Sequence, residues 1–429
     1  MSNVAETSET QQIFKQVYAD GVDNLVPNTN VLQKLFKFEN TQKIGKSYHF
    51  AVQVRWPQGS TWNGGTNYGL IKTLADSRAG LSLQAETKGC EYILRDMIAY
   101  GSASKSADGQ AAFTPITDLT VAAVVESTAW NLELMLMNGG GSIGAVASKT
   151  NSSATESAVI VTVASWAPGN WASYEGAQMD CYDSTLTTKQ NTNGPITIDS
   201  IDIDTRTINV TFAANADQTA CTAGDVFVPL GAFGNWVGGM LPTLTTSVAG
   251  GSLYGITTGD YALLQAGTYD ASGAALTFAK LANAAITSVT KGGMGDLTAL
   301  VSHYAWTDIN NDEAGSRRYT DDYGGEFVNG ADRLTYYGPN GGKLEVMPHP
   351  MMPAGNAVLI NPTDWRRIGS SEPTFELPGR GSMGNPMFLT ERQDENAWEF
   401  RRWWDQASIC KRLGRQVLIT NITNSSGPA

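Results

Sequence analysis

Leu119–Met137 is an almost wholly apolar run of nineteen residues, followed directly by Asn138 and then by three glycines, Gly139–Gly141. Glu126 and Glu133 lie within it. A charged residue near the centre of a membrane-spanning helix costs about 2.5–3.5 kcal/mol, whereas each Leu or Val returns about 0.3–0.6 kcal/mol. Because the run holds only seven Leu and Val residues, the two glutamates outweigh them. We therefore predict a helix of roughly 30 Å, at about 1.5 Å per residue, that is buried in protein and does not cross a membrane.

The ends and the polar face of this helix also follow from its residues. Thr117 or Asp118 is the expected N-cap, because either side chain accepts a hydrogen bond from the first turn. Gly139 is the expected residue just beyond the C-terminal end, where glycine adopts the left-handed conformation without strain. Glu126 and Glu133 are seven positions apart and share one face. The helix is therefore expected to carry one narrow polar stripe and an apolar surface wide enough for more than one packing partner.

The N-terminal region predicts extended structure that lacks a core of its own. Residues 1–45 hold short apolar patches separated by polar stretches and read as an arm. Residues 47–56 alternate partly with period two, 57–69 are rich in turn-forming residues, and 79–101 form a second β-like run. This order predicts a long hairpin, which is only marginally stable in water unless it lies on another surface.

The remainder of the chain predicts a β-rich module, one further helix and late strands, which gives an α+β class. Residues 154–232 contain alternating β-branched runs with Ser/Thr/Asn-rich joins, typical of an inserted β module. Residues 271–293 change to a helical period and end in two glycines. The expected apolar face of that helix holds Leu276, Ala279, Leu281 and Ile286. A short helix is expected near 306–313, and 396–422 is a long β-like stretch.

Composition narrows the function without deciding it. Charged residues make up 16% of the chain, against about 25% in an average globular protein. This depletion suits surfaces that meet other protein, although it also suits a plain β-rich secreted protein. The formal net charge of −12 argues against a sequence-specific nucleic-acid binder, which needs a basic footprint. The polar, acidic N-terminus has neither the charged nor the apolar part of a signal peptide.

The four cysteines, Cys90, Cys181, Cys221 and Cys410, are widely spaced and include no C-x-x-C pair. We expect free buried thiols in a reducing compartment. A disulfide between Cys181 and Cys221 is the alternative, because both fall in the same β-rich segment.

No motif indicates catalysis, a cofactor or a metal site. His49, His303 and His349 are isolated from one another in the sequence. The sequence "GGGSIG" (139–144) follows a predicted helix, whereas a dinucleotide-binding glycine loop follows a strand. The sequence "SASK" (102–105) lacks the companion motifs of the penicillin-binding enzymes. We therefore expect the chain to have no catalytic residues, cofactor or metal and not to be an enzyme.

Two weaker signals also have ordinary explanations. "DINNDEAG" (308–315) is reminiscent of a calcium loop, but Glu313 stands where the turn needs glycine. A sugar-binding face built from tryptophans near predicted loops is conceivable, although scattered aromatics more often serve cores or protein interfaces. The tryptophans concerned are Trp56, Trp62, Trp166 and Trp171.

The order of these parts and several stretches of sequence resemble the major capsid proteins of tailed bacteriophages. The stretches are "LELMLMNGGG" (132–141), the β segment within 176–231, the helix-containing 252–293, "LEVMPHPMMPAGNAVLINP" (344–362) and "RLGRQVLITNI" (412–422). The resemblance implies the Hong Kong 97-like capsid fold, with a β-sandwich or barrel-like module inserted in the axial domain.

The resemblance also implies domain boundaries. The expected parts are an N-terminal arm (1–45), an extended loop (46–88), a peripheral domain with a spine helix (89–138 and 385–429), an axial domain (139–153 and 233–384) and the inserted β-rich domain (154–232). The sequence shows no long charged helical leader, which within such a family implies a separate scaffolding protein or prior removal of a leader. Lys72 lies in the extended loop, but no acceptor for a covalent cross-link can be identified.

The implied function is self-assembly, through hexamers and pentamers, into an icosahedral shell around a double-stranded DNA genome. Identical neighbours would supply the surface that the arm and the hairpin need. The candidate inter-subunit contacts are Phe36, Arg55, Trp56, Trp62, Tyr68 and Lys72. Portal, scaffolding and decoration proteins are the other expected partners, with non-specific proximity to DNA, no membrane, and assembly in the host cytoplasm. The alternatives are a β-rich carbohydrate-binding or hydrolytic surface or tail protein, and a nanocompartment shell of the same fold.

Overall fold

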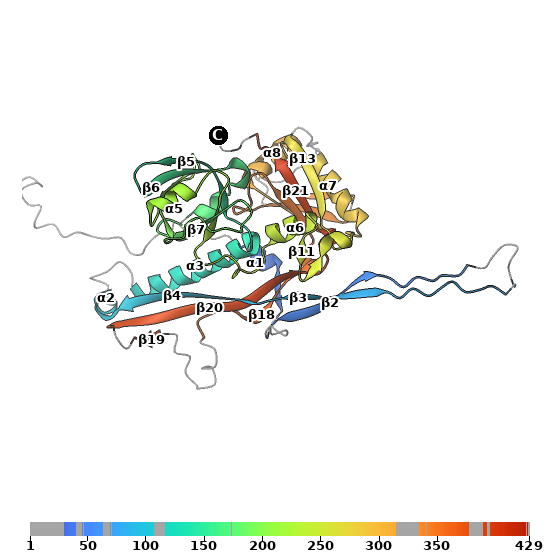
Figure 1. Cartoon of the computed structure of the whole chain (residues 1–429), viewed down its shortest axis with the longest axis horizontal. Coiled ribbons are helices and arrows are strands. Elements are labelled where there is room, and N and C mark those ends of the chain that lie inside the picture. Colours follow the sequence, from blue (N-terminus) through green and yellow to red (C-terminus); the bar gives the residue numbers. More distant parts are fainter. Residues whose placement is uncertain are drawn as a thin grey trace, which may run out of the picture. The chain divides into compact units, whose positions relative to one another are not determined.

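The computed structural model describes residues 30–39, 45, 47–62, 69, 71–106, 116–172, 174–314, 334–339, 341–376, 389–392, 395–425 and 427. Figure 1 shows the arrangement of the elements within each part of the chain. The chain forms two compact units. The first unit contains the described residues of Ile93–Ala129 and Pro373–Trp403. The second unit contains the described residues of Pro27–Tyr92, Trp130–Glu372 and Trp404–Ala429.

The long predicted helix is present as α3, Ile116–Asn138. It begins before both expected N-caps, so that Thr117 and Asp118 lie inside its first turn, where the Asp118 carboxylate is favoured by the helix dipole. At the other end Gly140, and not Gly139, takes the left-handed conformation, with φ of 84°. A Cβ atom on Gly139 would instead lie 1.9 Å from the carbonyl oxygen of Val237. Gly139 is therefore required for a close backbone approach. No described helix is long and apolar enough to cross a membrane.

The first unit has a small apolar core of its own. Val121 and Val124 of α3 pack with Ile98 and Phe400, which lie on β4 and β20. Strand β19 pairs antiparallel with β20, with Leu389 opposite Phe400. These strands are β4 Cys90–Ala99, β19 Leu389–Glu391 and β20 Ala397–Cys410, and helix α2, Tyr100–Ser106, directly follows β4.

The second unit contains a six-stranded mixed sheet in the order β13-β21-β17-β14-β16-β15. The strands are β13 Gly267–Ala274, β14 Leu297–Val301, β15 Leu334–Tyr337, β16 Lys343–Pro348, β17 Ala357–Ile360 and β21 Val417–Ile422. The helices of this region are α6 Met240–Val248, α7 Phe278–Thr290 and α8 His303–Ala314. Leu281, Ala284 and Ala285 of α7 are buried in one core cluster with the strands of this sheet. Of the face predicted for this helix, Ala279 and Ile286 are exposed.

The second unit also contains a closed barrel in the order β10-β5-β6-β9-β8-β7 (Figure 1). Its elements are β5 Gly144–Asn151, β6 Glu156–Val161, β7 Gln178–Tyr182, β8 Ile196–Asp202, β9 Thr207–Thr211 and β10 Val226–Pro229, with the short helices α4 Pro168–Trp171 and α5 Asn215–Ala220. The barrel begins with β5, ahead of residue 154, where the sequence places the start of the inserted module. Strand β5 belongs to it because β5 pairs with both β6 and β10.

The predicted hairpin consists of β2 Tyr48–Arg55 and β3 Leu81–Thr87, paired antiparallel from Tyr48 opposite Thr87. Part of the predicted arm is structured by its own chain. Helix α1 Leu32–Leu35 is followed by β1 Lys37–Glu39, which pairs parallel with β18 Trp365–Thr374. Strand β18 is followed in its sheet by β20, of which residues 404–410 belong to the second unit. The shortest described elements are β11 Ser252–Leu253, β12 Ile256–Thr257 and the 3-10 turns Val163–Ser165, Thr258–Asp260, Pro362–Asp364 and Leu413–Arg415.

Candidate assembly interface

The base of the β2–β3 hairpin is anchored on its own unit. Phe50 and Leu83 pack against a small cluster that contains Ile256 and Leu264. The rings of Phe50 and Tyr254 meet edge to face at 5.7 Å, and the Glu86 amide donates to the Tyr254 carbonyl over 2.9 Å. The alternation of half-buried and exposed positions along β2 follows from this one-sided packing. The hairpin is therefore held at its base.

The distal part of the hairpin has no such support among the described residues. Its two chains remain side by side through reciprocal backbone hydrogen bonds between Gln58 and Arg78, at 2.8 and 2.7 Å. The Ala75 amide donates to Thr61 Oγ1 over 2.7 Å. The Lys72 ammonium donates to the Trp62 carbonyl. These contacts preserve the two-stranded form and bury almost no apolar surface.

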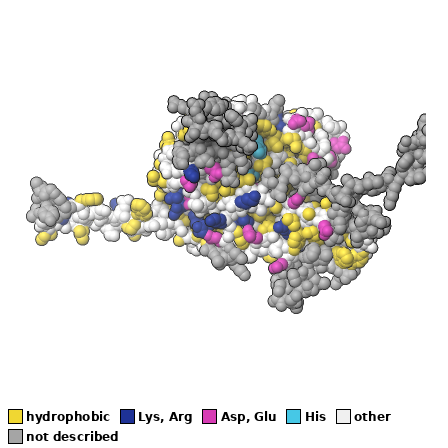
Figure 2. Space-filling model, turned by 180° about the vertical axis from the view of Figure 1, so that it is seen from behind, with side chains coloured by type: hydrophobic (Ala, Val, Ile, Leu, Met, Phe, Trp, Pro, Cys, Tyr) yellow, Lys and Arg dark blue, Asp and Glu magenta, His cyan; other side chains and the backbone are white. Residues whose placement is uncertain are grey.

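Large apolar side chains gather on this distal part. The exposed fractions are 79% for Trp56, 82% for Trp62, 106% for Ile71 and 78% for Leu74. Figure 2 shows hydrophobic side chains along the projecting hairpin, and Lys and Arg side chains gathered on the same face beside it. Exposed apolar surface that is concentrated in this way marks a site of contact with another molecule. We call Trp56, Trp62, Ile71 and Leu74 the tip cluster.

The predicted contact residues have different surroundings. Arg55, Trp56, Trp62 and Lys72 are all exposed, with Arg55 at the end of β2 and the other three beyond it. Tyr68 lies outside the described residues. Phe36 is fully buried and stacks on Trp365 with ring centroids 5.0 Å apart. Because its ring has no accessible surface, we no longer propose Phe36 as an inter-subunit contact.

A buried carboxylate fixes the arm to α3. Glu133 Oε1 accepts a hydrogen bond from the Leu32 amide at 2.5 Å, and Oε2 accepts one from the Gln33 amide at 3.1 Å. The side chain of Glu133 is completely inaccessible to solvent, and His349 Nε2 lies 3.0 Å from Oε1. A buried carboxylate needs such donors, because an unpaired one is strongly disfavoured by desolvation. Glu133 is thus a structural anchor, and the polar stripe expected on the helix does not face solvent at this position.

The protonation of His349 follows from its two neighbours. The Met351 amide donates to Nδ1 over 3.1 Å, so Nδ1 presents its lone pair and carries no proton. The ring proton therefore sits on Nε2 and is donated to Glu133. A neutral imidazole and a carboxylate with three donors form a satisfied network, which suits a permanent structural element.

Arg367 holds the other end of the arm segment. Its guanidinium donates to the carbonyls of Phe36 at 3.0 Å and Gln33 at 3.2 Å. It also donates to Gln406 Oε1 and Glu372 Oε1, both at 3.1 Å. The planar guanidinium satisfies several acceptors at once, which a lysine ammonium at this depth cannot do with the same geometry. We call Glu133, His349, Arg367, Phe36 and Trp365 the arm clamp.

Sequence reasoning missed the arm clamp. It named His349 only as isolated from the other two histidines and singled out neither Arg367 nor Trp365. The signal that was available is Glu133 itself, a charge inside an apolar run. Its partners are 101 and 216 positions away, so the sequence pattern alone gives no way to name them.

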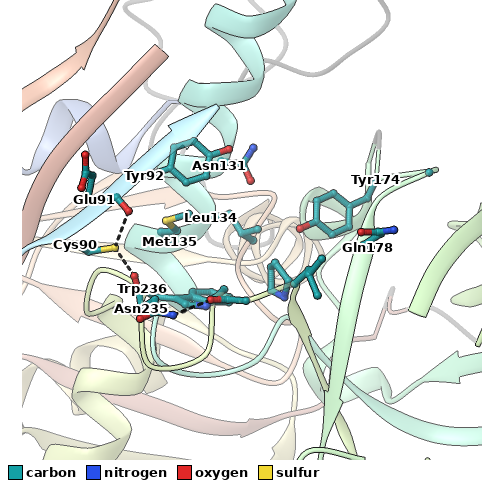
Figure 3. A pocket seen from close by; sticks show the side chains of 15 residues that line it. Cys90, Glu91, Tyr92, Asn131, Leu134, Met135, Tyr174, Gln178, Asn235 and Trp236 are labelled. Carbon is teal, nitrogen blue, oxygen red and sulfur yellow. Dashed lines mark hydrogen bonds between the residues drawn. The ribbon is translucent and has the colours of Figure 1, made fainter. Parts of the chain in front are cut away.

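A cavity of about 510 Å³ lies in the second unit beside the C-terminal part of α3 (Figure 3). Its lining includes Cys90, Tyr92, Met135, Tyr174 and Trp236. Burial raises the pKa of the Cys90 thiol to about 11 and that of Tyr92 to about 12. Both groups are therefore protonated at neutral pH, and Cys90 donates its proton to the Asn235 carbonyl. At neutral pH the Cys90 thiol is therefore not a thiolate nucleophile.

The motifs considered in the sequence fall in ordinary structural settings. Residues 139–144 terminate α3 and lead into β5, and 102–105 lie within α2. Residues 308–314 are part of α8, so they do not form a calcium loop. Trp166 and Trp171 are completely buried with centroids 6.3 Å apart, so they cannot form a sugar-binding face.

Comparison with known proteins agrees with the geometry. Residues 235–368 match the family model described as the SU10 major capsid protein. The capsid of a native GTA particle superposes with a TM-score of 0.50 at 12% identity, over 98% of this chain and 99% of that chain. The cyanophage A-1(L) capsid gives 0.52 at 11% identity, over 98% and 100%. The chain is a major capsid protein with the Hong Kong 97-like fold. No curated protein sequence matches it.

A major capsid protein is a structural component of the virion shell, and it associates with itself. The holo-SrpI encapsulin of Synechococcus elongatus also superposes, over 99% of this chain and 98% of that chain, but with 8% identity and a TM-score of 0.43, which carries no argument for a compartment function. Among the described residues, the tip cluster leaves large apolar side chains exposed, whereas the residues of the arm clamp are buried or hydrogen-bonded within the same chain.

Proposed function

We propose that this major capsid protein assembles through hexamers and pentamers into an icosahedral shell around double-stranded DNA, with the tip cluster as a contact between neighbouring copies. The observation that carries the proposal is the concentration of exposed apolar side chains on the distal hairpin. Burying a tryptophan ring removes about 150–250 Å² of surface from water, at roughly 25 cal/mol per Å². Repeated around a closed symmetric ring, the same contact stabilises every copy equally.

The charges beside the apolar side chains fit the same surface. Arg55 and Lys72 are exposed on the hairpin, together with Arg78. Charged groups at the edge of an apolar contact set the register of docking and contribute less to affinity. We therefore assign the orientation of neighbouring copies to Arg55 and Lys72, and the strength of the contact to Trp56 and Trp62. No catalytic step, cofactor or metal is assigned to shell formation.

Other partners follow from the requirements of a closed, filled shell. A portal protein would provide the entry for DNA, and a separate scaffolding protein would set the curvature during assembly in the host cytoplasm. A decoration protein is a further candidate partner of the outer surface. The negative net charge suits non-specific proximity to DNA without tight binding.

Replacement of both tip tryptophans tests the proposal. The double variant Trp56→Ser/Trp62→Ser should remain folded and should fail to form megadalton particles, as measured by sedimentation velocity and negative-stain microscopy. Met294 is 69% exposed and lies outside the hairpin, so Met294→Ser is the matched control and should assemble normally. Particles of unchanged mass and yield from the double variant would refute the assignment.

The contents of the particles test the rest of the proposal. Double-stranded DNA of one length, co-purified with particles from infected cells, is expected. Particles that instead contain one enzyme and no nucleic acid would indicate a nanocompartment.

A further inference from the structure

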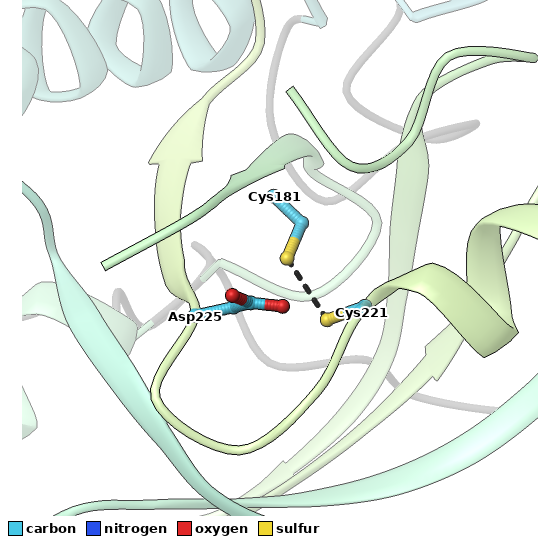
Figure 4. A group of neighbouring side chains, drawn as sticks. All are labelled: Cys181, Cys221 and Asp225. Carbon is cyan, nitrogen blue, oxygen red and sulfur yellow. Dashed lines mark hydrogen bonds between the residues drawn. The ribbon is translucent and has the colours of Figure 1, made fainter. Parts of the chain in front are cut away.

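Cys181 and Cys221 form a close pair inside the barrel. Their Sγ atoms are 2.9 Å apart, and neither side chain has accessible surface. Figure 4 shows the two sulfur atoms directed at each other, with Asp225 beside them. Cys181 lies on β7 opposite Phe227 of β10, and Cys221 directly follows α5. The pair thus joins a barrel strand to the segment that follows a helix.

Hydrogen bonds on both sides hold the two cysteines in place. The Cys181 amide donates to Asn191 Oδ1 over 2.7 Å. On α5, Gln218 Nε2 donates to the carbonyls of Ser153 and Glu156, both at 2.9 Å. Helix α5 is therefore fixed to the β5–β6 connection, and Cys221 has little freedom to move away from Cys181.

A metal ion is the competing explanation for this cluster. Cys181, Cys221 and Asp225 place three donor atoms within 4.8 Å of one another. However, structural zinc sites use four ligands, and the described residues supply three. Asp225 Oδ2 already accepts from the Thr222 amide at 2.6 Å. The Lys149 ammonium donates to the Cys221 carbonyl at 2.5 Å, and its positive charge opposes a cation here.

We propose that Cys181 and Cys221 form an intramolecular disulfide that locks α5 to the barrel after the particle leaves the reducing host cell. The timing rests on the proposed function, whereas the bond itself rests on the barrel alone. Closing the sulfurs from 2.9 Å to a bonded length of about 2.05 Å needs a shift of less than about 1 Å. Dissolved molecular oxygen is the oxidant. Two S–H bonds break, one S–S bond forms, and two protons and two electrons convert O₂ to hydrogen peroxide.

The surroundings make this oxidation slow and selective. The hydrogen bond with Cys221, together with burial, raises the pKa of the Cys181 thiol far above neutrality. Since the thiolate is the reactive form, oxidation proceeds through brief local opening of the barrel. Cys90 and Cys410 are not paired with another described cysteine. In a thiol count they therefore serve as internal controls that remain free.

Counting thiols in released particles tests the bond without any mutation. Particles are kept in air-equilibrated buffer without reductant, denatured in guanidinium with N-ethylmaleimide, and weighed intact. We expect two labels per chain, four after reduction, and a linked peptide that contains Cys181 and Cys221. Four labels without reduction would overturn the proposal. One zinc per chain, with two thiols that react only after chelation, would overturn it in favour of a metal site.

The stability readout uses matched variants. Reduction should lower the melting temperature of the wild type, and of a Cys90→Ser control, by about 5 °C, because a disulfide that closes a loop of this length constrains the unfolded chain. Reduction should not shift the melting temperature of Cys181→Ser/Cys221→Ser. Equal shifts in all three would overturn the proposed lock. Particle formation is scored separately, so failure of assembly and failure of the bond are distinguishable.

Discussion

The arm segment 30–39 and the distal hairpin are both short pieces of chain outside the main sheets, yet only the arm segment buries its large side chains within its own subunit. The arm ends in buried Leu32 and Phe36, and its backbone groups are met by Glu133 and Arg367. In the distal hairpin, the backbone is paired between Gln58 and Arg78, but the large side chains of the tip cluster are exposed. The difference teaches that backbone pairing and side-chain burial are separate requirements. A segment that meets only the first leaves apolar surface exposed to solvent.

Removing one aromatic ring from each segment should give the largest difference in unfolding free energy between them. Phe36→Ala leaves a cavity against Trp365 and should cost about 3–5 kcal/mol of unfolding free energy. Trp62→Ala removes a ring that is already in water and should change the stability of the unassembled chain by less than about 0.5 kcal/mol. Urea unfolding of the unassembled full-length chain measures both. Equal losses would show that the tip packs within its own subunit.

The next effect concerns the carboxylate of the arm clamp. Glu133→Gln keeps the shape and one acceptor oxygen, but it places an NH₂ group against backbone donors. We expect a loss of about 2–3 kcal/mol, the range for a hydrogen bond to a charged group. Hydrogen exchange of the Leu32 and Gln33 amides should accelerate in the same variant, while exchange in the barrel stays unchanged. Glu126→Gln, on the same helix, is the control and should leave those two amides protected.

A smaller effect is expected at Arg367. Arg367→Lys keeps the positive charge but cannot reach the Phe36 and Gln33 carbonyls and Gln406 with one planar group. We expect a loss of about 1.5 kcal/mol, the lower end of the range for one hydrogen bond that involves a charged group, because the lysine ammonium keeps part of these bonds. The exposed Arg55→Lys is the matched substitution and should leave urea unfolding unchanged. A stability equal to that of the wild type in Arg367→Lys would show that charge alone holds this end of the arm.

The sequence predicts features that depend on neighbouring residues better than features that depend on residues far apart in the chain. Helix α3 and the β2–β3 hairpin follow from runs and alternation in consecutive residues, and both were predicted. The burial of Glu133 was not, because it depends on residues more than a hundred positions away. The start of the barrel at β5 was placed too late, because "GAVASKTN" is mostly small and polar. Trp166 and Trp171 could not be assigned to the core from the sequence, because their burial depends on how the fold packs the residues in and before α4.

The smallest expected effect is on the pH dependence of the region around the arm clamp. Burial, and to a lesser extent the neighbouring His349 ring, lowers the pKa of His303 below its usual 6.5. Between that lowered pKa and about 6.5 the unfolded chain binds a proton at this site that the folded chain does not. The free energy of unfolding is therefore complete above pH 6.5 and falls as the pH drops through this window. Urea midpoints at pH 7.5 and 5.5 should differ less in His303→Gln than in the wild type. An identical drop in both proteins would place the titration at another group.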